Sequence, residues 1–175
     1  MEHIVVGSLF VVIIVVAGWL ILFYSNMTNK KALVETSWQL LFSQLQRRNE
    51  VVKSYIETAS QLKNPKLEFI NQFITASSGC INSQIPYDVM TSILETNKLI
   101  ENFKTENEFY LDADDNLNSQ LSQLEMSIDK YRELYNQRVL NYNMFLTQFP
   151  NNVACRILGV QKLPQIDGFT IIQEK

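Results

Sequence analysis

The chain has 175 residues, 46% of them hydrophobic, and a formal net charge of −3. About 150 residues remain beyond the first 25, enough for one domain that buries its core without disulfides or metal. Five Gly and four Pro are too few for a chain of β-turns, so the composition predicts an all-α fold. The only basic doublets are Lys30-Lys31 and Arg47-Arg48, which is too sparse a pattern for a nucleic-acid-binding surface.

An apolar segment without a charged side chain runs from Ile4 to Phe23. As a helix it spans about 30 Å, the thickness of a bilayer core. Trp19 and Tyr24 lie toward its C-terminal end, where aromatic rings favour the membrane interface. A cleaved signal peptide has a basic start, a shorter apolar core and a small-residue cleavage site, and the segment has none of these. The segment therefore predicts a retained transmembrane anchor.

Basic residues near the two ends of the anchor predict its orientation. The N-terminal flank carries Glu2, whereas Lys30 and Lys31 follow the C-terminal end. We therefore expect a short N-terminus outside the membrane and the rest of the chain in the cytoplasm.

The first helix is expected to run without interruption from Ile4 to Leu62, about 88 Å at the α-helical rise. No Pro or Gly occurs between Gly18 and Pro65. Residues recur at steps of four and three, which is typical of a helix that packs against other helices. This seam consists of Val34, Trp38, Leu41, Leu45, Arg48, Val52, Tyr55, Ala59 and Leu62.

Two shorter helices are predicted next. Asn64 and Pro65 indicate an N-cap and a first helical residue, and this helix ends near Ser78 and Gly79. Pro86 opens the following helix. The apolar faces of the two helices contain Leu67, Ile70, Ile74 and Ile81, then Val89, Ile93, Ile100 and Phe103.

An acidic stretch at 111–118 separates these helices from the last long one. Its spacing resembles a calcium-binding loop that begins at Asp112. Leu117 and Gln123 stand where such a loop needs Gly and Glu. We therefore interpret the stretch as a solvated loop that caps the next helix.

The fourth helix has the clearest pattern. Pro150 ends it, Asn151 or Asn152 is expected to cap a short further helix, and Gly159 closes that helix. The tail beyond Pro164 alternates weakly and either lies along the bundle or remains loose. The fourth seam consists of Leu117, Leu121, Leu124, Ile128, Tyr131, Tyr135, Arg138, Tyr142, Phe145 and Phe149.

Each long seam carries one arginine, Arg48 or Arg138. Such a residue usually extends its charged group to the edge of the interface. The alternative is a charged pair that fixes the register of the helices. The pattern does not choose an acidic partner for either arginine.

Two stretches resemble the LemA family of bacterial membrane proteins. The first combines Trp38 with Gln44, Leu45, Arg47 and Arg48. The chain departs from the family between 64 and 110, and it lacks the proline-containing stretch that usually follows the first motif. The second stretch comprises Glu125, Ile128, Arg132, Tyr135, Asn136, Val139, Tyr142, Asn143, Phe149, Pro150, Asn151, Asn152, Ala154, Gly159 and Pro164.

The resemblance implies a transmembrane helix that continues into an antiparallel up-and-down four-helix bundle with long first and fourth helices. It divides the chain into an anchor (1–25), a bundle (26–159) and a C-terminal tail (160–175), and it implies the bacterial plasma membrane. It brings no catalytic residue. We interpret the motif residues as structural, with a partner-binding surface as the alternative for the Tyr-Asn pairs. These residues are Trp38, Leu45, Arg48, Arg132, Tyr135, Asn136, Tyr142, Asn143, Pro150 and Asn152.

Residues that carry chemistry are scarce. His3 is the only histidine, which argues against Ser-His and Cys-His catalysis and against most zinc sites. Cys80 and Cys155 lie far apart, as expected for two buried thiols in a reducing compartment. We expect no cofactor and no metal, and we expect a non-enzymatic scaffold or adaptor whose partners are the bilayer and copies of itself. The alternative is a membrane-tethered sensor or regulatory module with one specific partner protein.

Self-association is expected because apolar residues outside the seams exceed what one bundle core needs. Tethering to a membrane would also raise the effective concentration of the copies. The surplus comprises Leu33, Leu40, Leu134, Val139, Leu140, Leu163, Ile166, Phe169, Ile171 and Ile172.

Overall fold

The computed structural model describes the backbone of residues 2–62, 71–77, 86–106, 115–167 and 170–172. Within these ranges it describes no side chains for 2–5, 55–62, 87, 100–106, 115–118 and 170–172. Almost all described residues are helical, so the all-α class is confirmed. Cys80 and the start of the predicted acidic loop, 111–114, lie outside the described residues, whereas the rest of that loop is helical, because α4 already begins at Asp115. The elements are α1 (Glu2–Leu62), a helical segment at 71–77, α3 (Pro86–Glu106), α4 (Asp115–Thr147), α5 (Asn151–Leu158), β1 (Gln165–Asp167) and β2 (Thr170–Ile172).

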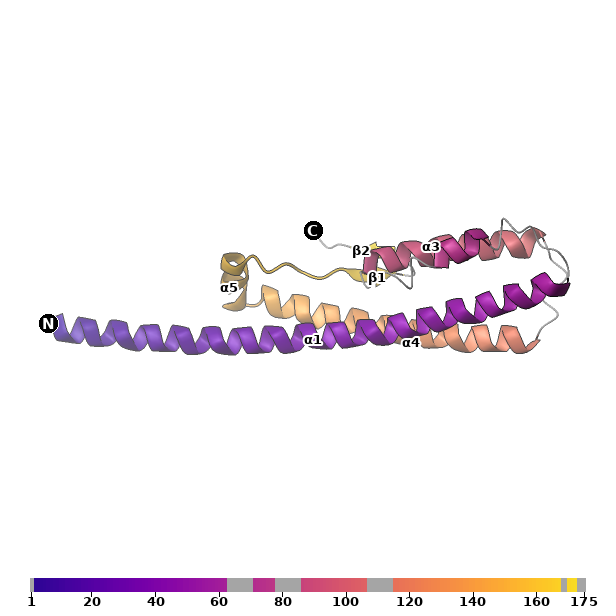
Figure 1. Ribbon diagram of the computed structural model, residues 1–175. Helices are drawn as coiled ribbons and strands as arrows, with labels where there is room; N and C mark the ends of the chain where they lie inside the picture. The colour runs from indigo at the N-terminus through magenta and orange to yellow at the C-terminus, as the bar shows by residue number, and fades with distance from the viewer. Residues whose placement is uncertain (1, 63–70, 78–85, 107–114, 168–169, 173–175) are drawn as a thin grey trace.

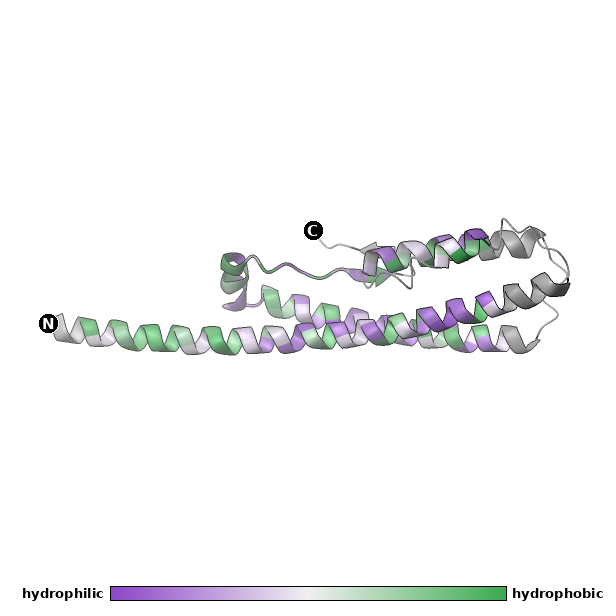
Figure 2. Cartoon of the chain, viewed as in Figure 1, coloured by the Kyte–Doolittle hydropathy of each residue, from purple (hydrophilic) through white to green (hydrophobic). Residues whose placement is uncertain are grey.

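Helix α1 is continuous for 61 residues, as the absence of Pro and Gly after Gly18 predicts. Its N-terminal part projects beyond the other helices (Figure 1) and is predominantly apolar (Figure 2). It is long and apolar enough to cross a membrane, and only 6% of its most apolar 18-residue stretch is buried. Because a core helix would bury this stretch, its exposed apolar side chains are those of a segment without a protein neighbour.

Helices α1 and α4 pack along each other and form most of the core. Trp38 meets Tyr135 edge-on, with 5.9 Å between ring centroids, and Phe23 stacks on Phe145 at 5.7 Å. Residue numbers fall along α4 as they rise along α1, so these two helices are antiparallel. The up-and-down arrangement of a complete four-helix bundle stays a prediction, because much of the segment between α1 and α3 lies outside the described residues.

The seam predicted for α1 is buried wherever its side chains are described. Tyr55, Ala59 and Leu62 fall outside those side chains. A stripe that follows the 3.6-residue helical period keeps its residues facing one neighbour, which here is α4. The buried members are Val34, Trp38, Leu41, Leu45, Arg48 and Val52.

The seam predicted for α4 is wrong at its C-terminal end. The buried row continues through Val139 and Leu146, whereas Arg138 and Phe145 are only half-buried. Both rows alternate steps of three and four from Tyr135, so spacing alone does not separate them. The apolar side chains of Val139 and Leu146 take the buried positions. Val139 is therefore not among the apolar residues available for self-association.

Two further expectations for this region need correction. Phe149 is 82% exposed, because α4 ends at Thr147 and a turn carries Phe149 away from the seam. Neither Asn151 nor Asn152 caps α5: the N-cap is Pro150, without a side-chain cap. Asn151 instead donates from Nδ2 to the carbonyl oxygen of Phe145 at 3.1 Å. Gly159 ends α5 in the left-handed conformation, φ 66°, as predicted.

The C-terminal tail lies along the bundle over the described residues. Strands β1 and β2 pair antiparallel, with Ile166 opposite Ile171. β1 packs on α4 and β2 contacts α3. Ile166 is almost completely buried in the core and Leu163 packs partly buried against it, so these two residues also leave the predicted surplus.

Replacing Trp38 or Tyr135 by Ala should destabilise the protein by about 3–5 kcal/mol, the usual cost of truncating a buried aromatic side chain. The melting temperature of the detergent-solubilised protein measures this loss. Met126→Ala is the matched control on α4, because Met126 is 72% exposed. Melting temperatures of Trp38→Ala and Tyr135→Ala equal to that of the control would contradict the seam.

Candidate functional site

The amide of Asn143 holds the extended segment that follows α5. Its Nδ2 donates to the carbonyl oxygen of Leu163, and its Oδ1 accepts from the amide N–H of Leu163, both at 2.9 Å. The side chain thus pairs with one residue's backbone as a neighbouring β-strand would. Asn143 is itself buried, so water does not replace these bonds without local opening.

Asn136, seven residues before Asn143 on α4, makes the same pair of hydrogen bonds with another residue of the segment. Its Nδ2 donates to the carbonyl oxygen of Ile166 at 2.7 Å, and its Oδ1 accepts from the Ile166 N–H at 2.9 Å. Between the two asparagine pairs, the Tyr135 hydroxyl donates to the carbonyl oxygen of Pro164 at 3.2 Å. We call the segment 160–167 the strap, because three side chains of α4 bond its backbone.

The two asparagine pairs agree in spacing. Seven helical residues separate Asn136 from Asn143, which is about 10 Å at the α-helical rise. Three residues separate Leu163 from Ile166, which is also about 10 Å in extended chain. The two intervals therefore match only if the strap is nearly fully extended and runs antiparallel to α4.

The tyrosines beside the two asparagines belong to the core. Tyr135 and Tyr142 are each 3% exposed, and burial raises the pKa of Tyr135 to about 12. The pKa of Tyr142 is also raised, mainly by burial. Tyr135 therefore stays a neutral hydrogen-bond donor to Pro164 over the physiological pH range.

Arg48 is buried within the α1 seam, with 8% of its surface exposed. Burial lowers the pKa of its guanidinium, and the negative charge of Glu125 on α4 opposes this shift. Its Nε and Nη1 have no hydrogen-bond partner among the described residues, nor do the amide atoms of neighbouring Asn49. The guanidinium does not extend to the edge of the interface, and a pair with Glu125 that fixes register stays a prediction. Arg138, on the other seam, is half-buried.

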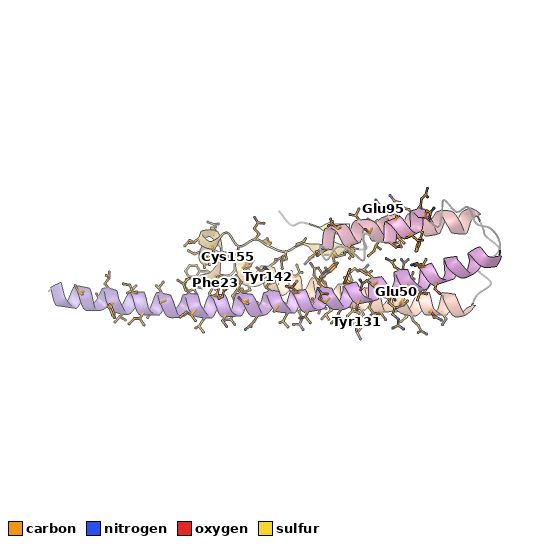
Figure 3. All side chains as sticks on the ribbon, in the orientation of Figure 1. Phe23, Glu50, Glu95, Tyr131, Tyr142 and Cys155 are labelled. Atoms are coloured by element: carbon orange, nitrogen blue, oxygen red, sulfur yellow. The ribbon has the colours of Figure 1, made fainter. Side chains whose placement is uncertain are left out.

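The end of the bundle nearest the apolar part of α1 is closed by aromatic contacts. Phe23 is 2% exposed because it lies between Trp19, at 6.1 Å, and Phe145. Lys30 Nζ lies 5.6 Å from the centroid of the Phe145 ring, within cation–π range. Figure 3 shows Tyr142 and Cys155 near this end, and Cys155 belongs to the same buried cluster as Phe23. The apolar segment is thus part of the bundle core at its C-terminal end.

The remaining motif residues have varied surroundings. Leu45 is buried in the α1 seam, and Arg132 forms an ion pair with Asp129 at 3.1 Å. Pro150 is half-buried at the start of α5. The Asn152 Oδ1 is buried and has no hydrogen-bond partner within the part of the chain that the structure describes.

Chemical groups suited to catalysis or metal binding are few in the described part of the chain. No group of three or more His, Cys, Asp or Glu side chains lies close enough there to hold a metal ion. The Cys155 thiol is free and buried, and burial raises its pKa. Most of the motif side chains described above are instead buried in the core or hydrogen-bonded to the backbone of the strap.

A comparison with protein-family models identifies a family. The model of the LemA family matches residues 37–173, which contain most of α1 beyond the apolar segment, α4, α5 and the strap. The chain belongs to the LemA family. A search of the curated proteins finds no match. The second LemA motif, from Glu125 to Pro164, includes all three side chains that bond the strap.

The sequence pattern left the partners of Asn136 and Asn143 open. We interpret the motif residues as structural from the sequence, and the pattern of the tail allows it either to lie along the bundle or to remain loose. One signal was available in the sequence: the distance from Asn136 to Asn143 along a helix equals the distance from Leu163 to Ile166 along an extended chain. In the structure the tyrosines of the Tyr-Asn pairs are buried and the asparagines bond the strap, and a partner-binding role for these pairs stays a prediction.

Asn143→Ala should release the strap, because it leaves the N–H and carbonyl of Leu163 without a partner, at about 1–3 kcal/mol. Hydrogen exchange measures this as faster exchange of the Leu163 and Ile166 amides. Asn141→Ala is the matched control, since Asn141 is an exposed asparagine on the same helix. Equal exchange in the two variants would contradict the role of Asn143.

Proposed function

We propose that this LemA protein is a non-enzymatic scaffold or adaptor, anchored by α1 in the bacterial plasma membrane, that assembles with copies of itself. The observation that carries the proposal is the continuity of α1. One uninterrupted helix contains both the exposed apolar segment and the seam that packs on α4. A bundle built on such a helix is held at a set distance and orientation from the bilayer.

A retained anchor is supported by the packing of its C-terminal end. Phe23 belongs to the bundle core, and Trp19 and Met27 pack against that core. Cleavage after the apolar segment would remove Phe23 and expose the ring of Phe145. Removing a buried aromatic costs about 3–5 kcal/mol, so a cleaved chain would have a weaker bundle.

A scaffold role is supported by what the LemA motif residues do. Trp38 and Tyr135 pack against each other, and Asn136 and Asn143 bond the strap. These side chains stabilise a shape.

Self-assembly is supported by apolar side chains that the chain leaves exposed on the two long helices. Leu33 and Leu40 are seven residues apart on α1, and Leu140 and Met144 are four apart on α4. Each pair lies on one face of its helix. Membrane tethering would hold two copies with aligned axes and raise their effective concentration.

The orientation of the anchor is tested with single cysteines in a chain that carries Cys80→Ser and Cys155→Ala. Met126→Cys should resist a membrane-impermeant maleimide in intact cells and react after lysis, because Lys30 and Lys31 favour a cytoplasmic bundle. His3→Cys should react in intact cells and serves as the matched control. The opposite labelling pattern would reverse the orientation.

The oligomer is tested by light scattering on the full-length protein in detergent. The protein mass should be a multiple of the 20.3 kDa chain mass. The double variant Leu33→Asn, Leu40→Asn should shift the distribution toward one chain, whereas Met126→Asn, at an isolated exposed site, should not. A wild-type mass of one chain at every concentration would rule out self-assembly.

The second candidate is a membrane-tethered sensor or regulatory module with one partner protein. The observation that favours it is Arg48, whose buried Nε and Nη1 have no partner among the described residues. Buried donors of this kind can be satisfied in a second arrangement of the helices, and a sensor needs two arrangements. Crosslinking in native membranes separates the candidates, because a single heterologous protein at fixed ratio supports the sensor and crosslinked copies support the scaffold.

A further inference from the structure

Helix α5 lies beside the part of α1 where the apolar segment ends. An apolar hollow at this position is lined by Leu20, Ile21, Phe23, Tyr24 and Ser25 of α1 and by Leu158 of α5. Figure 1 shows α5 at the end of the bundle from which the apolar part of α1 projects. If α1 crosses a bilayer from Ile4 to Phe23, α5 lies at the level of the membrane interface.

The outward face of α5 and its preceding turn is apolar. The helix buries Ala154 and Cys155 against the bundle. Phe149, Val153 and Ile157 follow one another at steps of four, and Phe149 and Ile157 are 82% and 78% exposed. A short surface helix in water normally presents polar residues outward, so this helix has apolar residues on the face that its own bundle does not cover.

The charged residues in the two sequence stretches that contain this face and the apolar segment have one sign. The sequence contains no acidic residue from Ile4 to Val34 or from Leu134 to Ile166. The same two stretches carry five basic residues, which are Lys30, Lys31, Arg138, Arg156 and Lys162. Apolar residues in segments whose charged residues are all basic are typical of the interface of a membrane containing anionic lipid.

We propose that α5 and the turn at 148–150 form an interfacial element. Phe149, Val153 and Ile157 enter the boundary between headgroups and acyl chains of the bilayer that α1 crosses, and Arg156 meets the headgroups. The proposal rests on the proposed membrane anchoring of α1, and it adds a second contact with the same membrane. Two contacts, one from α1 and one from α5, restrict the tilt and the rotation of the bundle relative to the bilayer.

The choice of the bilayer as occupant follows from continuity and charge. The hollow beside Leu158 joins the α5 face to the apolar surface of α1, so one apolar environment reaches both. A second copy of this chain would bring the same basic residues to the contact and place like charges together. An anionic lipid surface supplies the opposite charge without this repulsion.

The experiment measures the membrane depth of single sites in the full-length chain, reconstituted in vesicles that carry a quencher near the headgroups. In the background Cys80→Ser, Cys155→Ala, an environment-sensitive fluorophore is attached at Ile157→Cys. Met126→Cys is the matched control, an exposed apolar residue on the far part of α4. Ile13→Cys, in the middle of the apolar segment, reports separately on insertion of α1 with an acyl-chain quencher.

The proposal expects quenching at position 157 several-fold above that at position 126, with an emission shift to shorter wavelength. Phosphatidylcholine vesicles with added phosphatidylglycerol should give more quenching at 157 than phosphatidylcholine alone. Quenching at position 13 without quenching at 157 overturns the α5 contact and leaves the anchor intact. An emission shift at 157 without quenching by the headgroup quencher indicates a protein partner such as a second copy. That outcome also overturns the α5 contact with the bilayer. No quenching at position 13 contradicts the anchor itself, and the proposal falls with it.

Discussion

Trp38 packs edge-on against Tyr135 within the contact between α1 and α4, on which the rest of the fold is built. It sets the register of the two helices, so that Phe145 reaches Phe23 at the base of the bundle. Tyr135 also donates its hydroxyl hydrogen to the strap, which couples the core to the C-terminal segment. A large apolar ring with one polar group suits this position, because the ring fills the core and the hydroxyl reaches its edge.

The asparagine pairs extend the same register to the strap. Asn136 and Asn143 flank the seam and offer donor and acceptor atoms in one plane. An aspartate at either position would lose the donor and repel a carbonyl oxygen, and a leucine would offer neither atom. The two asparagine side chains, seven residues apart, therefore offer the strap the same donor and acceptor groups that the edge of a β-strand would.

The long helices were predictable from the sequence because an apolar seam and an absence of breakers act locally. Spacing alone does not distinguish Arg138 from Val139, because both fit the seam of α4. Packing against α1 buries Val139, the apolar residue of the two. Asn151 satisfies the cap rule for α5, yet it bonds Phe145, because the tight turn after α4 brings that carbonyl within reach. The partner of Asn143 lies twenty residues away, and local pattern alone does not identify such a pairing.

The buried charge at Arg48 shows what the bundle tolerates. A guanidinium with two donors unpaired among the described residues opposes folding, and the charge of Glu125 offsets only part of the desolvation. The aromatic and aliphatic seam residues on either side must outweigh this cost. The seam thus supplies stability that the desolvation of Arg48 partly offsets.

The strap links the end of the bundle that carries α5 to α3 through the two short strands. Residues 160–164 connect α5 to β1, β1 pairs with β2, and β2 contacts α3. Because Asn136 and Asn143 fix the strap to α4, α5 has little freedom to move away from α1 while both pairs are formed. A displacement of α5 away from α4 would pull first on the Leu163 pair, which is the nearer of the two along the chain. The two asparagine pairs thus link α5, through the strap, to α4 and to the small sheet.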